Sequence, residues 1–202
     1  MKRKDNSLVL RQRLGAEIVI NKPEEFFLDV RKMNVDALLK MEDYPPSLTK
    51  LKMEDEEKVQ DALVLMLLDA VRFFNVVRPP NEDQLFMIAD MIMEEYSYFS
   101  LMDLGICFKM GKLGRWGKVY DRLDGGIFLE WCTSYDNYRT EKAEQIKRKY
   151  KTIRWVLRQH ISKGVSTLWT WEDDEFICLF NSYDDDARIY TAQQLLDKLE
   201  KL

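Results

Sequence analysis

Two helical repeats joined by a Pro-Pro turn constrain the fold of this chain more than any other feature. From Val59 to Phe74 the apolar residues recur at i, i+3, i+4 and i+7, which is the pattern of an amphipathic α-helix. A second repeat runs from Leu85 to Met93 with Asn81 as a candidate N-cap, and Pro79 and Pro80 separate the two. Helices with matching apolar stripes and a short connection pack together, so we expect an antiparallel helical hairpin in the core.

Further helices are predicted on both sides of this hairpin. Pro23 opens a helical pattern, and Ser100 is a candidate N-cap for another helix, with Asp103 at its third position. The longest helical pattern covers Gly126 to Ser162. The short apolar run from Glu17 to Ile20 instead resembles a strand.

The C-terminal segment has a different pattern. Alternation with a period of two from Val165 to Trp171, and an apolar run from Phe176 to Phe180, predict a β-hairpin. A capping box at Thr191–Gln194 predicts a short terminal helix. The predicted fold class is therefore mainly α, a single-domain helical bundle with a small C-terminal β-hairpin and a short terminal helix. We divide it into a mixed, partly helical arm (1–43), a helical core (44–163) and an appendage of hairpin and helix (164–202).

The composition excludes several classes of protein. The chain has 202 residues with 31 basic and 35 acidic side chains, and its net charge of -4 argues against a basic nucleic-acid coat protein. Three cysteines without a CxxC motif and a single histidine, His160, argue against a disulfide scaffold and a zinc site. No apolar run reaches the length of a membrane span or of a signal-peptide core. We expect a cytoplasmic protein without metal, cofactor or membrane contact, and the sequence leaves its oligomeric state open.

The segment 105–126 holds six of the eight glycines, and its centre, Gly111–Lys118, reads Gly-Lys-Leu-Gly-Arg-Trp-Gly-Lys. Freed backbone amides and cations can bind phosphate, and Trp116 can stack on a base. The structural alternative is a tight connection between helices, with solvated cations and a tryptophan that anchors the loop. A Walker A loop is excluded because Val119 stands where Ser or Thr must hold magnesium.

A basic helix follows the loop in sequence. From Arg139 to Arg158 there are eight basic residues and two acidic ones, a net charge of +6. Such a run can contact a phosphate backbone, or it can pair with the acidic segment 160–202. The candidate nucleic-acid contacts are the cations of the loop, of its C-terminal flank and of this helix, together with the loop tryptophan: Lys112, Arg115, Trp116, Lys118, Arg122, Lys147, Arg148, Lys151 and Arg154.

Several motifs lie between Tyr44 and Arg139. They are Tyr98–Phe108, Gly111–Gly117, a Tyr-Asp-Arg-Leu-Asp-Gly stretch at 120–125 and the spaced residues Trp131, Tyr135 and Arg139. With these motifs, this part of the chain resembles a family of uncharacterised proteins encoded by phages and conjugative elements of anaerobic gut bacteria. The helical layout is also distantly similar to phage replication-accessory proteins such as helicase loaders. The resemblance implies a role in a mobile element. The family has no assigned activity, so the resemblance implies no chemical reaction.

Two functions follow as hypotheses. The first is a non-enzymatic accessory protein of a phage or mobile element that contacts a DNA or RNA backbone, with replication or other mobile-element proteins as candidate protein partners. The alternative is an acidic protein–protein adaptor that binds no nucleic acid. An enzyme is disfavoured, because Asp121 and Asp124 beside Arg122 have no partnering histidine, nucleophile or metal motif nearby.

Overall fold

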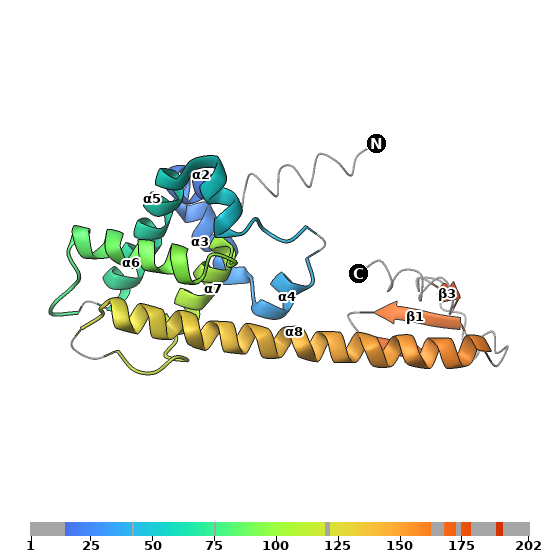
Figure 1. The fold of residues 1–202 in the computed structure, drawn as a ribbon. Helices are drawn as coiled ribbons and strands as arrows, with labels where there is room; N and C mark the ends of the chain where they lie inside the picture. The colour runs from blue at the N-terminus through green and yellow to red at the C-terminus, as the bar shows by residue number, and fades with distance from the viewer. Residues whose placement is uncertain are drawn as a thin grey trace. The chain divides into compact units, whose positions relative to one another are not determined.

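The computed structural model describes residues 15–41, 43–74, 76–119 and 122–162 and three short strands beyond them (Figure 1). This part of the chain is mainly helical, which confirms the predicted class. Its helices are α2 (Ala16–Asn21), α3 (Pro23–Lys32), α4 (Val35–Leu39), α5 (Leu48–Phe74), α6 (Glu82–Glu95), α7 (Leu101–Lys112) and α8 (Gly125–Ser162). None of the helices described is both long and apolar enough to cross a membrane.

The chain forms two compact units, Met1–Lys142 and Ala143–Leu202, and α8 contributes residues to both. This boundary differs from the three segments proposed from the sequence, and that finer division stays a prediction.

Helices α5 and α6 pack against each other as an antiparallel pair, as the sequence predicts. The N–H groups of Leu48 and Thr49 at the start of α5 donate to the carbonyls of Phe99 and Ser97, just beyond the end of α6, at 2.7 and 2.9 Å. Asn81 caps α6 in a complete capping box with Gln84. The apolar stripes of the two helices are buried between them and the rest of the core.

Helix α5 contains a break at Asp55, within the polar stretch Glu54–Lys58 that the sequence indicates as the first turn of the helix over Val59–Phe74. The Asp55 backbone is extended, with φ -164° and ψ 97°. Its carboxylate accepts the N–H of Lys58 at 3.1 Å and thereby caps the second part of the helix.

Helix α7 lies at the centre of the first unit and is buried on nearly every side. Of its residues 101–111 only Lys109 is not buried, which is the pattern of a helix enclosed by others. Phe128, Trp131 and Tyr135 on one face of α8 pack into the same core.

The strand expected at Glu17–Ile20 is wrong, because these residues belong to α2. Ile18 and Val19 are buried there, and α2 packs against α5 and α3. A four-residue apolar run does not distinguish a strand from a buried helical turn.

Beyond α8 lie strands β1 (Leu168–Glu172), β2 (Glu175–Cys178) and β3 (Ile189–Thr191), with β1 antiparallel to both of the others. The turn residues 173–174, the expected terminal helix and the first 14 residues lie outside the described residues. The predicted C-terminal appendage therefore stays a prediction.

Candidate functional site

The glycine-rich stretch begins inside the last turn of α7 and ends that helix in a Schellman motif. The N–H of Gly114 donates to the carbonyl of Gly111 at 2.8 Å, and the N–H of Arg115 donates to that of Met110 at 3.0 Å. Gly114 has the positive φ, +73°, that this motif requires. Both amides are thus bound by the helix end and are not available to a phosphate.

The other two glycines have different roles. At Gly111 an added Cβ would lie 2.5 Å from the Trp131 ring, so this glycine permits close packing of α7 on α8. Gly117 has φ +110° and open space around it, and its N–H donates to the carbonyl of Gly114 at 3.4 Å. The loop therefore uses the amides of Gly114, Arg115 and Gly117 internally, and the amide cradle considered from the sequence does not form from them.

Trp116 anchors the loop to the core. Its indole N–H donates to the carbonyl of Cys107 at 2.9 Å, and its half-buried ring contacts that of Tyr138 edge to face at 6.1 Å. This arrangement corresponds to the structural alternative for the tryptophan.

Lys112 points away from the loop and towards α3 and α5. Its ammonium group forms an ion pair with Asp69 and lies 5.9 and 5.8 Å from the ring centres of Phe27 and Phe73. These are cation–π distances.

Lys112 lines a cleft of about 460 Å³ between α3, α5 and α7, which we call the cationic cleft. Arg31, Arg72 and Lys109 also line it, and Asp69 is the one acidic residue of this lining. Phe73, with 60% of its surface exposed, gives the cleft an aromatic edge.

Lys109 joins the cleft to the end of α3. Its ammonium group donates hydrogen bonds to the backbone carbonyls of Val30, at 2.8 Å, and of Met33. These bonds satisfy carbonyl oxygens at the C-terminal end of α3. Burial lowers the pKa of Lys109, and the nearby charge of Arg115 lowers it further. Arg115 lies two residues beyond Leu113, which is part of the cleft lining.

Two arginines of the cleft lining, and Arg115 of the adjoining loop, differ from the cleft lysines in their contacts. Arg31, Arg72 and Arg115 are exposed, and none of them forms an ion pair with any residue that the structure describes. Their charges are therefore available to an anionic ligand.

The other predicted contacts lie outside this lining. Lys118 is exposed, and the exposed Arg122 pairs with Asp124 at 3.2 Å. Lys147 and Lys151 are exposed and belong to the second unit, as does Arg148, which pairs with Glu144 at 2.7 Å. The side chain of Arg154 and those of the acidic C-terminal segment lie outside the described residues.

A buried polar network surrounds Asp103, which is 0% exposed. One carboxylate oxygen accepts the hydroxyls of Tyr44 and Tyr135 at 2.9 and 2.8 Å and lies 3.1 Å from Nε of Arg139. The other accepts the N–H and hydroxyl of Ser100 at 2.9 and 2.7 Å. This carboxylate thus joins α7, α8 and the segment that precedes α5.

Burial and the Asp103 charge raise the pKa of the Tyr44 and Tyr135 hydroxyls. The pKa of Arg139 is raised because Asp103 and Tyr44 outweigh the effect of burial, which lowers it. The hydroxyls of Tyr44 and Tyr135 and the guanidinium group of Arg139 therefore keep their protons near neutral pH.

From the sequence, Asp103 was predicted as a capping residue and Arg139 as part of the basic run, and both lie in motifs of the family resemblance, but neither was assigned to a buried network. Two signals could have found the network. Asp103 is an acid in an otherwise apolar helical stretch, and Tyr135 and Arg139 follow Trp131 at intervals of four on the buried face of α8.

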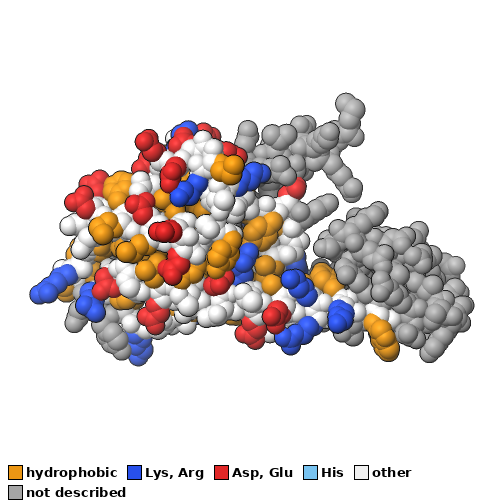
Figure 2. Space-filling view, viewed as in Figure 1, with side chains coloured by type: hydrophobic (Ala, Val, Ile, Leu, Met, Phe, Trp, Pro, Cys, Tyr) orange, Lys and Arg blue, Asp and Glu red, His pale blue; other side chains and the backbone are white. Residues whose placement is uncertain are grey.

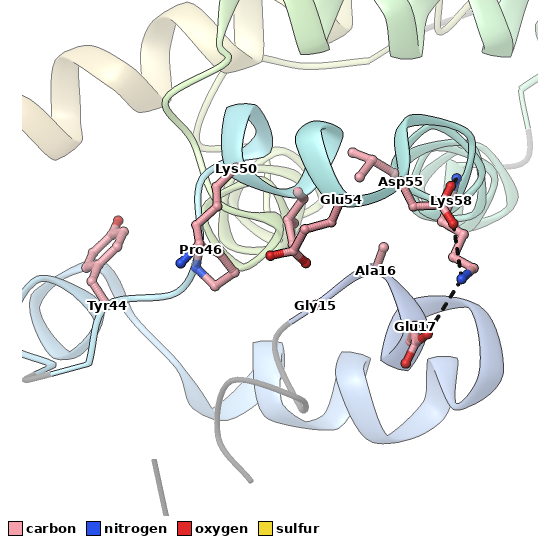
Figure 3. Close-up of a pocket in the computed structure, with 11 residues that line it drawn as sticks. Gly15, Ala16, Glu17, Tyr44, Pro46, Lys50, Glu54, Asp55 and Lys58 are labelled. Atoms are coloured by element: carbon pink, nitrogen blue, oxygen red, sulfur yellow. Dashed lines mark hydrogen bonds and ion pairs between the residues drawn. The ribbon is translucent and has the colours of Figure 1, made fainter. Parts of the chain in front are cut away.

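A second pocket, of about 480 Å³, lies between α2 and the start of α5 (Figure 3). Acidic and basic side chains share its lining, and Lys58 reaches Glu17 at 3.6 Å and Asp55 at 3.1 Å. It therefore presents no concentrated charge of one sign. Among the described residues, no group of His, Cys, Asp and Glu could hold a metal ion.

Comparison of the chain with protein-family models, with curated proteins and with solved structures finds no match.

Proposed function

We propose that this protein is a non-enzymatic accessory protein of a phage or mobile element that binds the phosphate backbone of a nucleic acid at the cationic cleft. The observation that carries the proposal is a pair of arginines in the cleft lining, Arg31 and Arg72, that form no ion pair with any described residue. Arg115, in the loop that continues from Leu113 of the lining and likewise without an ion pair among the described residues, is proposed to extend this surface. A guanidinium group can donate two hydrogen bonds to two oxygens of one phosphate. The exposed Phe73 offers a ring on which a base can stack.

The proposed contact surface differs from the loop backbone suggested by the sequence. The loop contributes Arg115, and the cleft adds two arginines from α3 and α5. The exposed Lys147 and Lys151 of α8 are proposed as a second backbone contact. We also keep two predictions from the sequence as part of this proposal. They are a cytoplasmic location and a C-terminal appendage made of a β-hairpin and a terminal helix.

The test is fluorescence anisotropy with labelled single- and double-stranded oligonucleotides, from 50 to about 300 mM salt. The triple change Arg31→Ala, Arg72→Ala, Arg115→Ala should make the slope of log K against log salt shallower by roughly two to three units, where K is the association constant for the oligonucleotide. The slope changes because each phosphate that the variant no longer neutralises keeps its counterion when the complex forms. Lys112 and Trp116 are left unchanged in this variant because both hold the fold together.

The matched control removes the same charge elsewhere, by Lys22→Ala, Lys50→Ala and Lys52→Ala, and should keep most of the wild-type slope. The double change Lys147→Ala, Lys151→Ala measures how much the basic part of α8 contributes to the salt dependence of oligonucleotide binding. If the wild-type chain binds no oligonucleotide at 50 mM salt, or if both triple variants weaken binding equally, the cleft is not a nucleic-acid site. The adaptor function then becomes the surviving hypothesis.

A further inference from the structure

Helix α6 presents an outward face that the nucleic-acid proposal does not use. Its inward residues are buried, whereas Met87 and Met91 are 59% and 47% exposed, one turn apart. Tyr98, just beyond the helix, is also 47% exposed. Figure 2, drawn from the side on which α6 lies in front, shows apolar and acidic side chains together over this helix.

The charge of this face has one sign. Helix α6 carries five acidic residues and no lysine or arginine: Glu82, Asp83, Asp90, Glu94 and Glu95. All five are exposed. A phosphate backbone would be repelled here, so this face does not serve the function proposed above.

A hollow of about 410 Å³ adjoins the face where the start of α5 meets the end of α6. Its lining includes Met53, which is 85% exposed, Met93 and Glu94. Lys52 lines it as well, and its charge is paired with that of Glu56 at 2.9 Å. Methionine adapts its shape to different partners and is used heavily on surfaces that bind amphipathic helices. We call the outward residues Met53, Met87, Met91, Glu94, Glu95 and Tyr98 the methionine face.

We propose that the methionine face docks a basic amphipathic helix of a partner protein. Apolar side chains of that helix at i and i+4 would contact Met87 and Met91, which have the same spacing. Its lysines or arginines would lie beside Glu94 and Glu95, and one apolar anchor would enter the hollow beside Met53. Charge complementarity selects a basic helix over an acidic one.

The proposal is tested with a labelled model peptide, a helix of leucine and lysine roughly 18 residues long with leucines at i, i+3, i+4 and i+7. A peptide of the same composition with its leucines dispersed around the helix is the ligand control. Anisotropy should show saturable binding of the amphipathic peptide, and binding of the dispersed peptide at least about tenfold weaker.

The variant Met87→Gln, Met91→Gln should weaken peptide binding by about tenfold while keeping the wild-type melting curve, because both side chains are exposed. Leu28→Gln is the matched apolar control, since Leu28 is 48% exposed on α3. The variant Glu94→Gln, Glu95→Gln should weaken binding mainly at low salt, with Glu24→Gln, Glu130→Gln as the charge control.

Three outcomes overturn the proposal. If the two peptides bind equally, or if the methionine and control variants bind alike, the face does not recognise a helix. If sedimentation shows that the wild-type chain self-associates and that Met87→Gln, Met91→Gln abolishes this, the face belongs to a second copy of the chain. Oligonucleotide binding by the methionine variant should equal that of the wild type, so this test is independent of the cationic cleft.

Discussion

Asp103 determines more of this structure than any other single residue. Its carboxylate accepts hydrogen bonds from two tyrosines, a serine and the backbone, and it pairs with Arg139. A buried charge is tolerated only when it is paired and fully hydrogen-bonded, and this arrangement meets both conditions.

Asp103→Asn should therefore destabilise the protein strongly. The amide keeps the size of the side chain but leaves the Arg139 charge without its counterion. We expect a loss of about 3 kcal/mol in the free energy of unfolding, at the low end for a buried pair because 21% of the Arg139 side chain is exposed. Urea denaturation followed by circular dichroism measures it. Asp61→Asn, at an exposed position, is the control, and equal stability of the two variants would contradict the role given to Asp103.

At the scale of single elements, the junction of α7 and α8 depends on one missing side chain. Gly111 lies against the face of the Trp131 ring, which is itself buried. Neither a helix backbone nor a buried indole can move away cheaply.

Gly111→Ala should cost about 1–3 kcal/mol because the new methyl group overlaps the Trp131 ring. Gly126→Ala is the control. There the nearest atom is 3.4 Å away and the residue lies in the first turn of α8, so the change should be neutral or stabilising by up to about 1 kcal/mol. Thermal melts of the two variants measure the difference, and a Gly111→Ala protein as stable as the wild type would show that α7 and α8 pack less closely than described.

The helices were predictable from the sequence where a strong apolar period met a clear cap. The start of α6 at Asn81 and of α7 at Ser100 are examples. The polar residues Glu54–Lys58 indicated the start of the second part of α5, beside the break at Asp55. The helical residues from Leu48 that precede it were not predicted, because so short a stretch shows little apolar period. The conformation of Glu17–Ile20 depended on a packing partner, α5, distant in sequence.

The candidate site was predictable only in part, for a related reason. A sequence shows that Lys112 and Trp116 are a cation and an aromatic residue, but not that Asp69 and the Cys107 carbonyl already hold them. Arg31 and Arg72 lie far from the loop in sequence, so only the fold could bring them to the same cleft. The local spacing of glycines and cations thus pointed to the loop Gly111–Lys118. It did not show which cations in and around this loop an anion can reach.

For the whole molecule, stability should fall as the pH rises above neutral. Burial raises the pKa of the Cys107 thiol, and burial with the Asp103 charge raises that of Tyr135. Burial and Asp136 also raise the pKa of Tyr98 to about 12. At a pH below the ordinary pKa values of these groups, the folded and the unfolded states both keep the protons. In that range these groups therefore cause no change of stability with pH. Above about pH 8.5 for the thiol and about 10 for the tyrosines, only the unfolded state releases protons readily.

Urea denaturation between about pH 7 and 11 should therefore show a decline that steepens near pH 10. The slope is up to about 1.4 kcal/mol per pH unit for each of the buried groups Cys107 and Tyr135, and smaller for Tyr98, which is 47% exposed. Tyr135→Phe removes one titrating hydroxyl, so its decline should be shallower than that of the wild type even though the variant is less stable at pH 7. A decline of unchanged slope would show that Tyr135 does not retain its proton in the folded state.

The Asp103 network also has a consequence for how the chain folds. Its hydroxyl contacts span 59 residues back to Tyr44 and 32 residues forward to Tyr135. Closing such long loops costs chain entropy before the contacts can form, so we expect these bonds to form late in folding. Until they form, a charged carboxylate cannot leave water, and α7 cannot settle at the centre of the core. The same residue that stabilises the finished fold therefore delays its completion until three distant segments of the chain have met.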